Sequence, residues 1–168
     1  LMAAAEHERL SEEEYTYFAE DLKKAGSLVY LTDNCGEIVL DKLFVSCIKK
    51  HYPQLQITVI VRGENVINDA TLEDADEVGL TELVPCIGNG NGAPSTVLAR
   101  LSEQAKKTLK NADVVISKGQ GNFEGLYGEG INPYYLFLCK CELFVRRFGL
   151  QQYRSVFMKE ERINLKEC

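Results

Sequence analysis

Short apolar runs alternate with longer segments of helical spacing along this chain. A polar helix is expected over Glu12–Lys24, and the apolar run Leu28–Leu31 follows it. In Glu37–Lys50 apolar residues recur with helical spacing, and the β-branched run Ile57–Val61 precedes a helix expected from Thr71. Runs of this kind predict strands that each lead into a helix.

The alternation continues through the second half of the chain. Leu83–Ile87 predicts a weaker strand, followed by a glycine-rich turn and a helix over Ser95–Leu109. Asp113–Ser117 predicts another strand, and the glycines of Lys118–Gly130 predict a loop. Tyr134–Leu138 predicts a fifth strand, whereas the last twenty residues have no readable pattern.

Strands that alternate with helices in this way determine the expected fold class. Right-handed crossovers make a mostly parallel sheet that is covered by helices on both faces. A length of 168 residues is that of one ordinary domain. We therefore expect residues 1–168 to form a single α/β domain with three layers, α/β/α.

The amino-acid composition and the net charge exclude some classes of binding partner. The chain has 45% hydrophobic and 26% charged residues, as in a globular protein, and it contains no apolar run long enough to span a membrane. A net charge of -6 disfavours binding to nucleic acid or to an anionic membrane surface. The six cysteines lack a CxxC spacing, and the lone pair Cys139 and Cys141 is expected to serve packing. We expect a cytoplasmic protein with free thiols and a small-molecule substrate.

Polar or glycine-rich motifs follow four of the predicted strands. They are Asp33–Glu37, Arg62–Asp69, Gly88–Gly92 and Lys118–Asn122. In parallel sheets ligands bind beyond the carboxyl ends of the strands, and those ends lie at one edge. The four motifs are therefore expected to lie together.

These motifs contain the groups needed for metal-assisted phosphate chemistry. Asp33, Asn34 and Asp69 offer hard oxygen ligands for a divalent cation, Mg²⁺ or Mn²⁺, and such ligands also accept Co²⁺ or Ni²⁺. Lys118 at a strand end is placed to meet a phosphoryl oxygen, and the amides of Gly88–Gly92 are a second candidate. A metal and a lysine together stabilise the charge that develops in phosphoryl transfer. The pattern indicates metal-dependent phosphate-ester hydrolysis.

Each motif also has an ordinary structural interpretation. Asx residues at a strand end commonly cap a helix, and either Asp69 or Thr71 could do so, the latter in a capping box with Asp74. Glu37 and Asp41, one helical turn apart, are ordinarily a solvent-facing pair. The glycines do not match GxGxxG, so a dinucleotide site is disfavoured.

Three segments resemble a known family. DNCGE at Asp33–Glu37 with Asp41, RGENVIND at Arg62–Asp69, and DVVISKGQGN at Asp113–Asn122 with Glu124 are similar to the family called domain of unknown function 89. Its members are known as damage-control phosphatases. The three motifs occur in the right order, and the KGQGN form resembles the branch found largely in prokaryotes.

The resemblance implies a three-layer α/β/α catalytic domain and a divalent-metal phosphatase that acts on small phosphorylated metabolites, especially damaged or wasteful sugar phosphates. By matching positions, it implies one role for each motif residue: metal ligands Asp33, Asn34 and Asp69; the phosphate contact Lys118; loop-shaping and substrate-binding Gly119 and Asn122; and Asn65 and Asn68 lining the site. Asp33 or a water molecule on the metal would lie nearest the phosphorus.

The chain departs from the family in two ways, and further functions stay open. Cys35 stands where the family usually has a small residue such as alanine, and the family's N-terminal helical region, often with a paired-cysteine motif, is not recognised here. A haloacid-dehalogenase-like phosphatase would need a DxD pattern that is missing. The motifs are also compatible with an S-adenosylmethionine-dependent protein carboxyl methyltransferase and with a non-catalytic metal- or metabolite-binding module. The pattern fixes neither the physiological substrate nor the oligomeric state.

Overall fold

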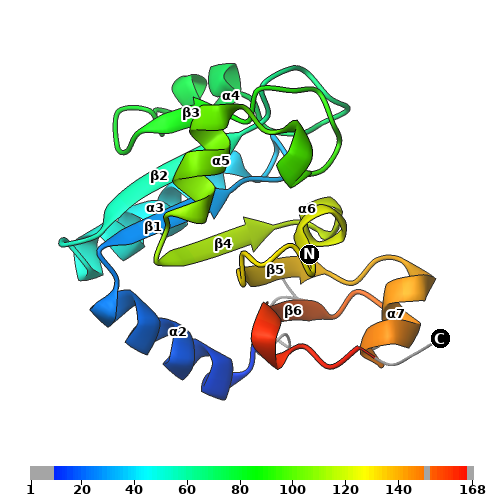
Figure 1. Cartoon of the computed structure of the whole chain (residues 1–168). Helices are drawn as coiled ribbons and strands as arrows, with labels where there is room; N and C mark the ends of the chain where they lie inside the picture. The colour runs from blue at the N-terminus through cyan, green and yellow to red at the C-terminus, as the bar shows by residue number, and fades with distance from the viewer. Residues whose placement is uncertain (1–9, 150–151, 166–168) are drawn as a thin grey trace.

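A six-stranded sheet organises the part of the chain that the computed structural model describes, residues 10–149 and 152–165 (Figure 1). Its strand order is β3-β2-β1-β4-β5-β6, in which β6 alone runs antiparallel to its neighbour. The predicted mostly parallel α/β sheet is thereby confirmed. The strands are β1 (Ser27–Leu31), β2 (Gln56–Val61), β3 (Cys86–Gly88), β4 (Val114–Lys118), β5 (Tyr134–Leu138) and β6 (Ser155–Lys159).

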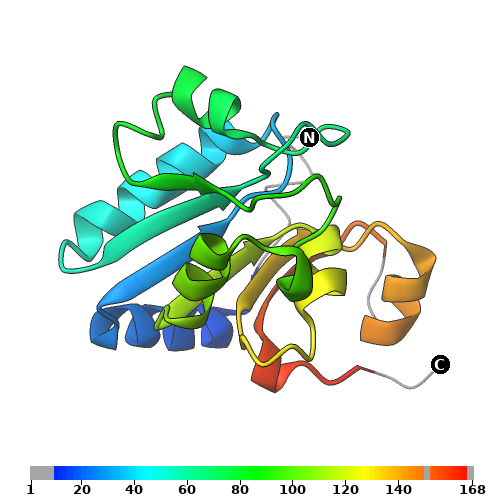
Figure 2. The ribbon, with the colours of Figure 1, turned by 45° about the horizontal axis from the view of Figure 1, so that its top comes forward.

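Helices cover both faces of this sheet, which makes the three layers that were expected (Figures 1 and 2). Alternate residues of each strand point to opposite faces, so Leu28 and Tyr30 join one apolar cluster and Val29 and Leu31 join the other. The first cluster includes residues of α2 (Glu12–Lys24), α3 (Ile38–His51) and α4 (Leu72–Glu77). The second includes residues of α5 (Glu103–Lys110), α6 (Gln120–Leu126) and α7 (Glu142–Phe148).

The helix expected over Ser95–Leu109 begins later than predicted. A 3-10 turn, Leu98–Arg100, comes first, and α5 starts only at Glu103. The residues before the 3-10 turn are bound to another segment instead of forming a helix, because the amide of Thr96 donates to Asn122 Oδ1 at 3.0 Å. Ser102 then caps α5 by accepting a hydrogen bond from the amide of Ala105 at 3.2 Å.

The loop predicted over Lys118–Gly130 is wrong in part, because α6 forms within it. Glycine has low helix propensity, but two of these glycines are required by packing. A Cβ at Gly125 would lie 2.4 Å from the carbonyl oxygen of Thr96, and one at Gly121 would lie 3.0 Å from that of Pro94. The helix therefore needs glycine where it passes close to the backbone of another segment.

The last part of the described chain adds β6, which the sequence pattern did not reveal. β6 pairs with β5, and charged side chains tie its end to α2. Arg162 pairs with Glu14 at 2.6 Å and Lys159 pairs with Asp21 at 2.8 Å.

None of the helices among the described residues has the length and apolar character needed to cross a membrane.

Candidate active site

The loops after β1 and β2 are joined to each other beyond the carboxyl edge of the sheet. The amide of Ala70 donates to the carbonyl oxygen of Asp33, and the amide of Cys35 donates to that of Asn68, both at 2.8 Å. An isolated bridge also pairs Asn34 with Asp69. The two carboxylates and the amide proposed as metal ligands are thus on directly connected segments.

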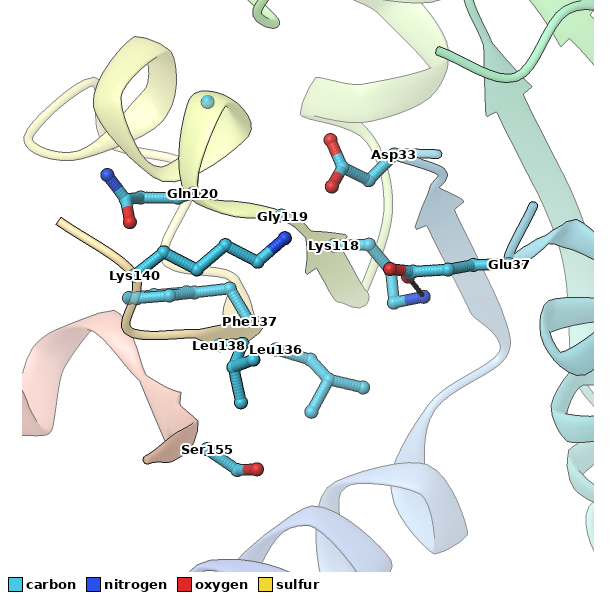
Figure 3. A pocket seen from close by; sticks show the side chains of 11 residues that line it. Asp33, Glu37, Lys118, Gly119, Gln120, Leu136, Phe137, Leu138, Lys140 and Ser155 are labelled. Atoms are coloured by element: carbon cyan, nitrogen blue, oxygen red, sulfur yellow. Dashed lines mark hydrogen bonds and ion pairs between the residues drawn. The ribbon is translucent and has the colours of Figure 1, made fainter. Parts of the chain in front are cut away.

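A pocket of about 320 Å³ opens beside these loops, at the ends of β4 and β5 (Figure 3). Its charged lining includes Asp33, Glu37 and Lys118, and Figure 3 shows Asp33 and Glu37 on one side of it. The other lining residues are Gly119, Gln120, Gly121, Leu136, Phe137, Leu138, Lys140 and Ser155. The structure therefore brings the predicted Asp33, Lys118 and Gly119 to one cavity.

The Asp33 carboxylate lies directly against the backbone of Gly119. A Cβ at Gly119 would be 2.1 Å from Asp33 Cγ, and Gly119 has a φ of +82°. Burial raises the pKa of Asp33, and repulsion by Asp69 and Glu37 adds to the effect. No hydrogen bond from the described residues reaches this carboxylate, which leaves its oxygens available to a ligand.

Asp69 is held by a buried arginine and does not cap a helix. Thr71 is the N-cap of α4 and forms the capping box with Asp74 that its spacing suggested. Arg62 Nε donates to Asp69 Oδ2 at 2.5 Å, and Arg62 is only 4% exposed. This single contact orients Asp69 and leaves its second oxygen without a hydrogen bond from the described residues.

Arg62 has a role that the sequence analysis did not assign. Besides Asp69, its guanidinium donates to Asn122 Oδ1 at 2.8 Å and to Thr96 Oγ1 at 3.2 Å. The sequence holds one sign of this role, because Arg62 comes directly after an apolar strand. A cation that is buried at such a position requires several hydrogen-bond partners. Arg62 joins the loop after β2 to α6 and to the segment before α5.

Asn122 is fully buried, and all of its polar atoms are used by the protein. Its amide nitrogen donates to the carbonyl oxygens of Thr32 at 2.9 Å and Lys118 at 2.7 Å. Its oxygen accepts from Arg62 and from the amide and hydroxyl of Thr96. Asn122 thus ties Lys118 to the end of β1, and it offers no free group to a substrate.

Lys118 is fixed between two carboxylates. Its ammonium donates to Glu37 and to Asp41, each at 2.7 Å, and Tyr30 also donates to Asp41 at 2.7 Å. Burial lowers the pKa of Lys118, but the two carboxylates outweigh it and raise the pKa overall. The expectation of a solvent-facing pair is wrong for Asp41, which is 2% exposed.

The remaining predicted site residues lie away from the pocket. Asn65 and Asn68 are exposed, and Asn65 lines a separate hollow beside Arg62. The Gly88–Gly92 turn packs against Gly63, whose amide donates to Asn89 Oδ1 at 2.8 Å. Two amides of the turn are used within the protein, since that of Asn89 donates to the carbonyl oxygen of Val61 and that of Asn91 donates to Asn89 Oδ1.

The oxygen ligands proposed for a metal fit a hard cation. No group of three or more His, Cys, Asp or Glu side chains within residues 10–149 and 152–165 is arranged to hold a metal ion. The predicted set is instead two carboxylates and one amide. Asn34 Oδ1 accepts from the amide of Gly36 at 2.8 Å and has a second lone pair. The Asp33 carboxylate accepts no hydrogen bond from the part of the chain that the structure describes, and it is repelled by Asp69; a divalent cation would relieve that repulsion.

Comparison with known proteins decides the family. The family model described as the damage-control phosphatase ARMT1-like domain matches residues 2–156. The chain belongs to the damage-control phosphatase ARMT1-like family. The resemblance inferred from the three motifs is therefore confirmed.

Relatives of this family member are found among archaeal proteins. A damage-control phosphatase of Archaeoglobus fulgidus is 37% identical over 75% of this chain and 44% of its own length. One from Pyrococcus horikoshii is 31% identical over 84% of this chain and 50% of its own length. The crystal structure of a DUF89 family protein from Pyrococcus horikoshii superposes with a TM-score of 0.81 at 29% identity, covering 86% of this chain and 51% of that one. The chain spans about half the length of the curated relatives it matches.

Proposed function

We propose that this chain carries the active site of a divalent-metal-dependent phosphatase that hydrolyses small phosphorylated metabolites. One observation carries the proposal. The Asp33 carboxylate, which has no ion pair within residues 10–149 and 152–165 and is repelled by Asp69, lies in the same pocket as Lys118 at the carboxyl edge of the sheet. The phosphatase names of the relatives support the same reaction class.

Asp33, Asn34 and Asp69 would hold the cation, with Mg²⁺ or Mn²⁺ the expected ion and Co²⁺ or Ni²⁺ also compatible. When bound, such an ion supplies Lewis-acid stabilisation to a phosphoryl oxygen. Lys118 has three N–H donors, and Glu37 and Asp41 occupy two of them. The third donor is left for the substrate's phosphoryl group.

The charges around the pocket explain why a metal is needed. The cations that neighbour the proposed metal ligands, Lys118 and Arg62, are both paired with carboxylates, so neither presents its full charge to a ligand. A phosphate dianion that approached without a metal would be repelled by the acidic groups. These are Asp33, Glu37, Asp41 and Asp69.

The size and polarity of the pocket favour a small substrate. A volume of about 320 Å³ is at the lower end for ligand sites, suiting a sugar-phosphate-sized molecule. The net charge of -6 disfavours a nucleic-acid partner. The cysteines of the described residues are free, which supports the predicted cytoplasmic location.

The test is hydrolysis of p-nitrophenyl phosphate and of a panel of sugar phosphates with each divalent metal. Asp33→Ala, Asp69→Ala and Lys118→Ala are compared with Glu129→Ala, which removes an exposed carboxylate outside the pocket. We expect metal-dependent turnover that the first three variants lose and the control retains. Tight metal binding without turnover of any phosphoester would contradict the proposal and favour a binding module.

A further inference from the structure

The pocket that contains Asp33 and Lys118 has an apolar wall as well as a charged one. Figure 3 shows Leu136 and Leu138 of β5 close to each other, on the side of the pocket away from Asp33. The groups assigned to phosphate chemistry occupy the other side. A molecule whose phosphate lies beside Asp33 and Lys118 therefore brings its organic part into a space that these leucines border.

Both leucines lie on the same face of the sheet as Lys118. Leu136 is the register partner of Lys118, and side chains at paired positions of neighbouring strands point to the same side. Leu138 returns to that face two residues later, whereas Phe137 between them packs into the apolar cluster on the opposite face. Because a strand rises about 3.3 Å per residue, the apolar wall begins beside Lys118 and extends about 7 Å along β5.

Helix α2 packs over the beginning of β5, and the end of the strand is open to the pocket. Phe18 of α2 contacts the rings of Tyr134 and Phe157, with centroid distances of 5.0 Å and 5.3 Å. At the other end of β5, Leu136 is only partly buried and Leu138 is 36% exposed. Apolar side-chain surface is therefore accessible to a molecule bound in the pocket.

A single exposed leucine is common on protein surfaces and needs no function. This pair differs because both members line the cavity that contains Lys118 and lie on the strand directly beside it. A substrate hydroxyl placed against them would lose water without gaining a hydrogen bond from these side chains, which is unfavourable. An alkyl or deoxygenated group would instead bury apolar surface, which is favourable.

Gln120 lines another part of the same pocket and gives the competing interpretation. Its Oε1 atom has no hydrogen-bond partner among the described residues and is able to accept from a substrate hydroxyl. That atom offers one acceptor, whereas a polyol chain presents several hydroxyl groups. A polyol would also have to place part of its length against the leucines.

We propose that the substrates of this pocket are phosphate monoesters whose organic part is largely apolar, and that Leu136 and Leu138 bind that part. The inference rests on the proposed phosphatase function and adds a substrate class to it. The leucines act on the organic part, and Asp33 and Lys118 act on the phosphate. Changes at the apolar wall should therefore alter the choice among esters and leave the affinity for phosphate itself unchanged.

The experiment uses esters that share the same phosphate group. With Mn²⁺ present, kcat/KM is measured for ethyl, butyl and hexyl phosphate, and propyl phosphate is compared with glycerol phosphate, the same carbon chain with hydroxyl groups. We expect kcat/KM to rise about two- to fourfold for each added methylene, the scale expected for burying one such group. Propyl phosphate should be a better substrate than glycerol phosphate.

Variants of Leu138 assign this preference to β5. Leu138→Asn keeps a similar side-chain size but makes it polar, whereas Leu138→Met keeps it apolar. Leu143→Asn is the matched control, because Leu143 is exposed on α7 outside the pocket. We expect Leu138→Asn to reduce the gain per methylene by about half or more, with an unchanged Kd for inorganic phosphate by calorimetry. Leu138→Met and Leu143→Asn should keep the dependence on chain length.

The outcomes separate this inference from the proposed function. In an active protein, equal kcat/KM values along the alkyl series, or a preference for glycerol phosphate, overturn the inference and leave the phosphatase intact. The same gain per methylene in Leu138→Asn as in the unmodified protein overturns the role of β5. If no phosphoester is turned over with any divalent metal, the phosphatase proposal fails. Calorimetry with the alkyl phosphates then tests the wall alone, since affinity that rises with chain length supports it and equal affinities contradict it.

Discussion

Arg62 and Asp69 form a buried ion pair across the loop that follows β2, with Nε and Oδ2 separated by 2.5 Å. The loop is closed by backbone contacts as well, since the amide of Arg62 donates to the carbonyl oxygen of Ala70 at 2.9 Å. The same guanidinium reaches Asn122 in α6. One arginine therefore connects a proposed metal ligand with the helix that follows Lys118.

Replacing Arg62 should destabilise the protein strongly. Arg62→Met removes the cation and leaves Asp69 and Asn122 Oδ1 without this donor in a largely buried setting. Breaking one partner of a buried pair typically costs about 3–5 kcal/mol. The free energy of unfolding in urea measures the loss.

Arg100→Met is the matched control for this change, because Arg100 is exposed. We expect it to alter the free energy of unfolding by less than about 0.5 kcal/mol. Equal losses in the two variants would show that the Arg62 network does not stabilise the fold.

The two carboxylates that hold Lys118 should contribute unequally. Both lie 2.7 Å from its ammonium, but the side chain of Asp41 is 3% exposed and that of Glu37 is 44% exposed. Asp41→Ala also leaves the Tyr30 hydroxyl without its acceptor, so we expect a loss of about 3 kcal/mol or more. Glu37→Ala should cost less than about 1 kcal/mol, because solvent screens an exposed pair.

Thermal and urea unfolding of the two variants make this comparison directly. The distance and the lysine are shared, so the two variants differ in the burial of the carboxylate and in the Tyr30 hydrogen bond to Asp41. A larger loss in Glu37→Ala than in Asp41→Ala would contradict the burial argument.

The sequence was sufficient to place the groups that lie at the ends of strands or in the loops that follow them. Asp33, Asp69 and Lys118 could be assigned to one edge because parallel strands end on the same side, whatever their packing. Gly119 could be assigned to the same edge because it is the residue after Lys118. Such predictions depend on strand periodicity, which is strong in β1, β2 and β4.

The parts that sequence reasoning missed depend on contacts between distant segments. Asp41 is buried because Lys118, 77 positions later, and Tyr30 both bind it, and helical spacing alone made it look solvent-facing. The glycines of α6 suggested a loop, yet the backbone of Pro94–Thr96 requires them. Propensity is local, so it cannot reveal which segment will lie against a helix.

The carboxylate of Asp113 should make stability depend on pH in acid. The hydroxyl of Ser27 and the amides of Gly26 and Ser27 all donate to it at 2.9 Å, and these bonds lower the pKa of Asp113 below its ordinary value. A lowered folded-state pKa gives stability that is present above the unfolded pKa and lost as pH falls through the folded one.

We therefore expect Asp113→Ala to be less stable than the unmodified protein near neutral pH, with a difference that shrinks as pH falls below about 4. Urea unfolding at several pH values measures it. Glu129→Ala, which removes an exposed carboxylate with no partner among the described residues, should show no such convergence. A difference for Asp113→Ala that grows toward acid pH would have the wrong sign.

Gly119 and Gly128 offer a controlled test of the contact that places Asp33. Both have a φ of +82°, so alanine strains the backbone equally at either position, at a cost of about 1–2 kcal/mol. A Cβ at Gly128 meets no atom within 4 Å, whereas one at Gly119 overlaps the Asp33 carboxylate. Gly119→Ala should therefore displace Asp33 and lower Mn²⁺-dependent turnover about a hundredfold, the scale of a 1 Å misplacement. The Gly128→Ala variant should be less stable but should keep its turnover. Calorimetry should show weaker Mn²⁺ binding in Gly119→Ala than in Gly128→Ala, even where both variants are folded. If both variants bind Mn²⁺ as the unmodified protein does, the close approach of Gly119 to Asp33 has no part in the metal site.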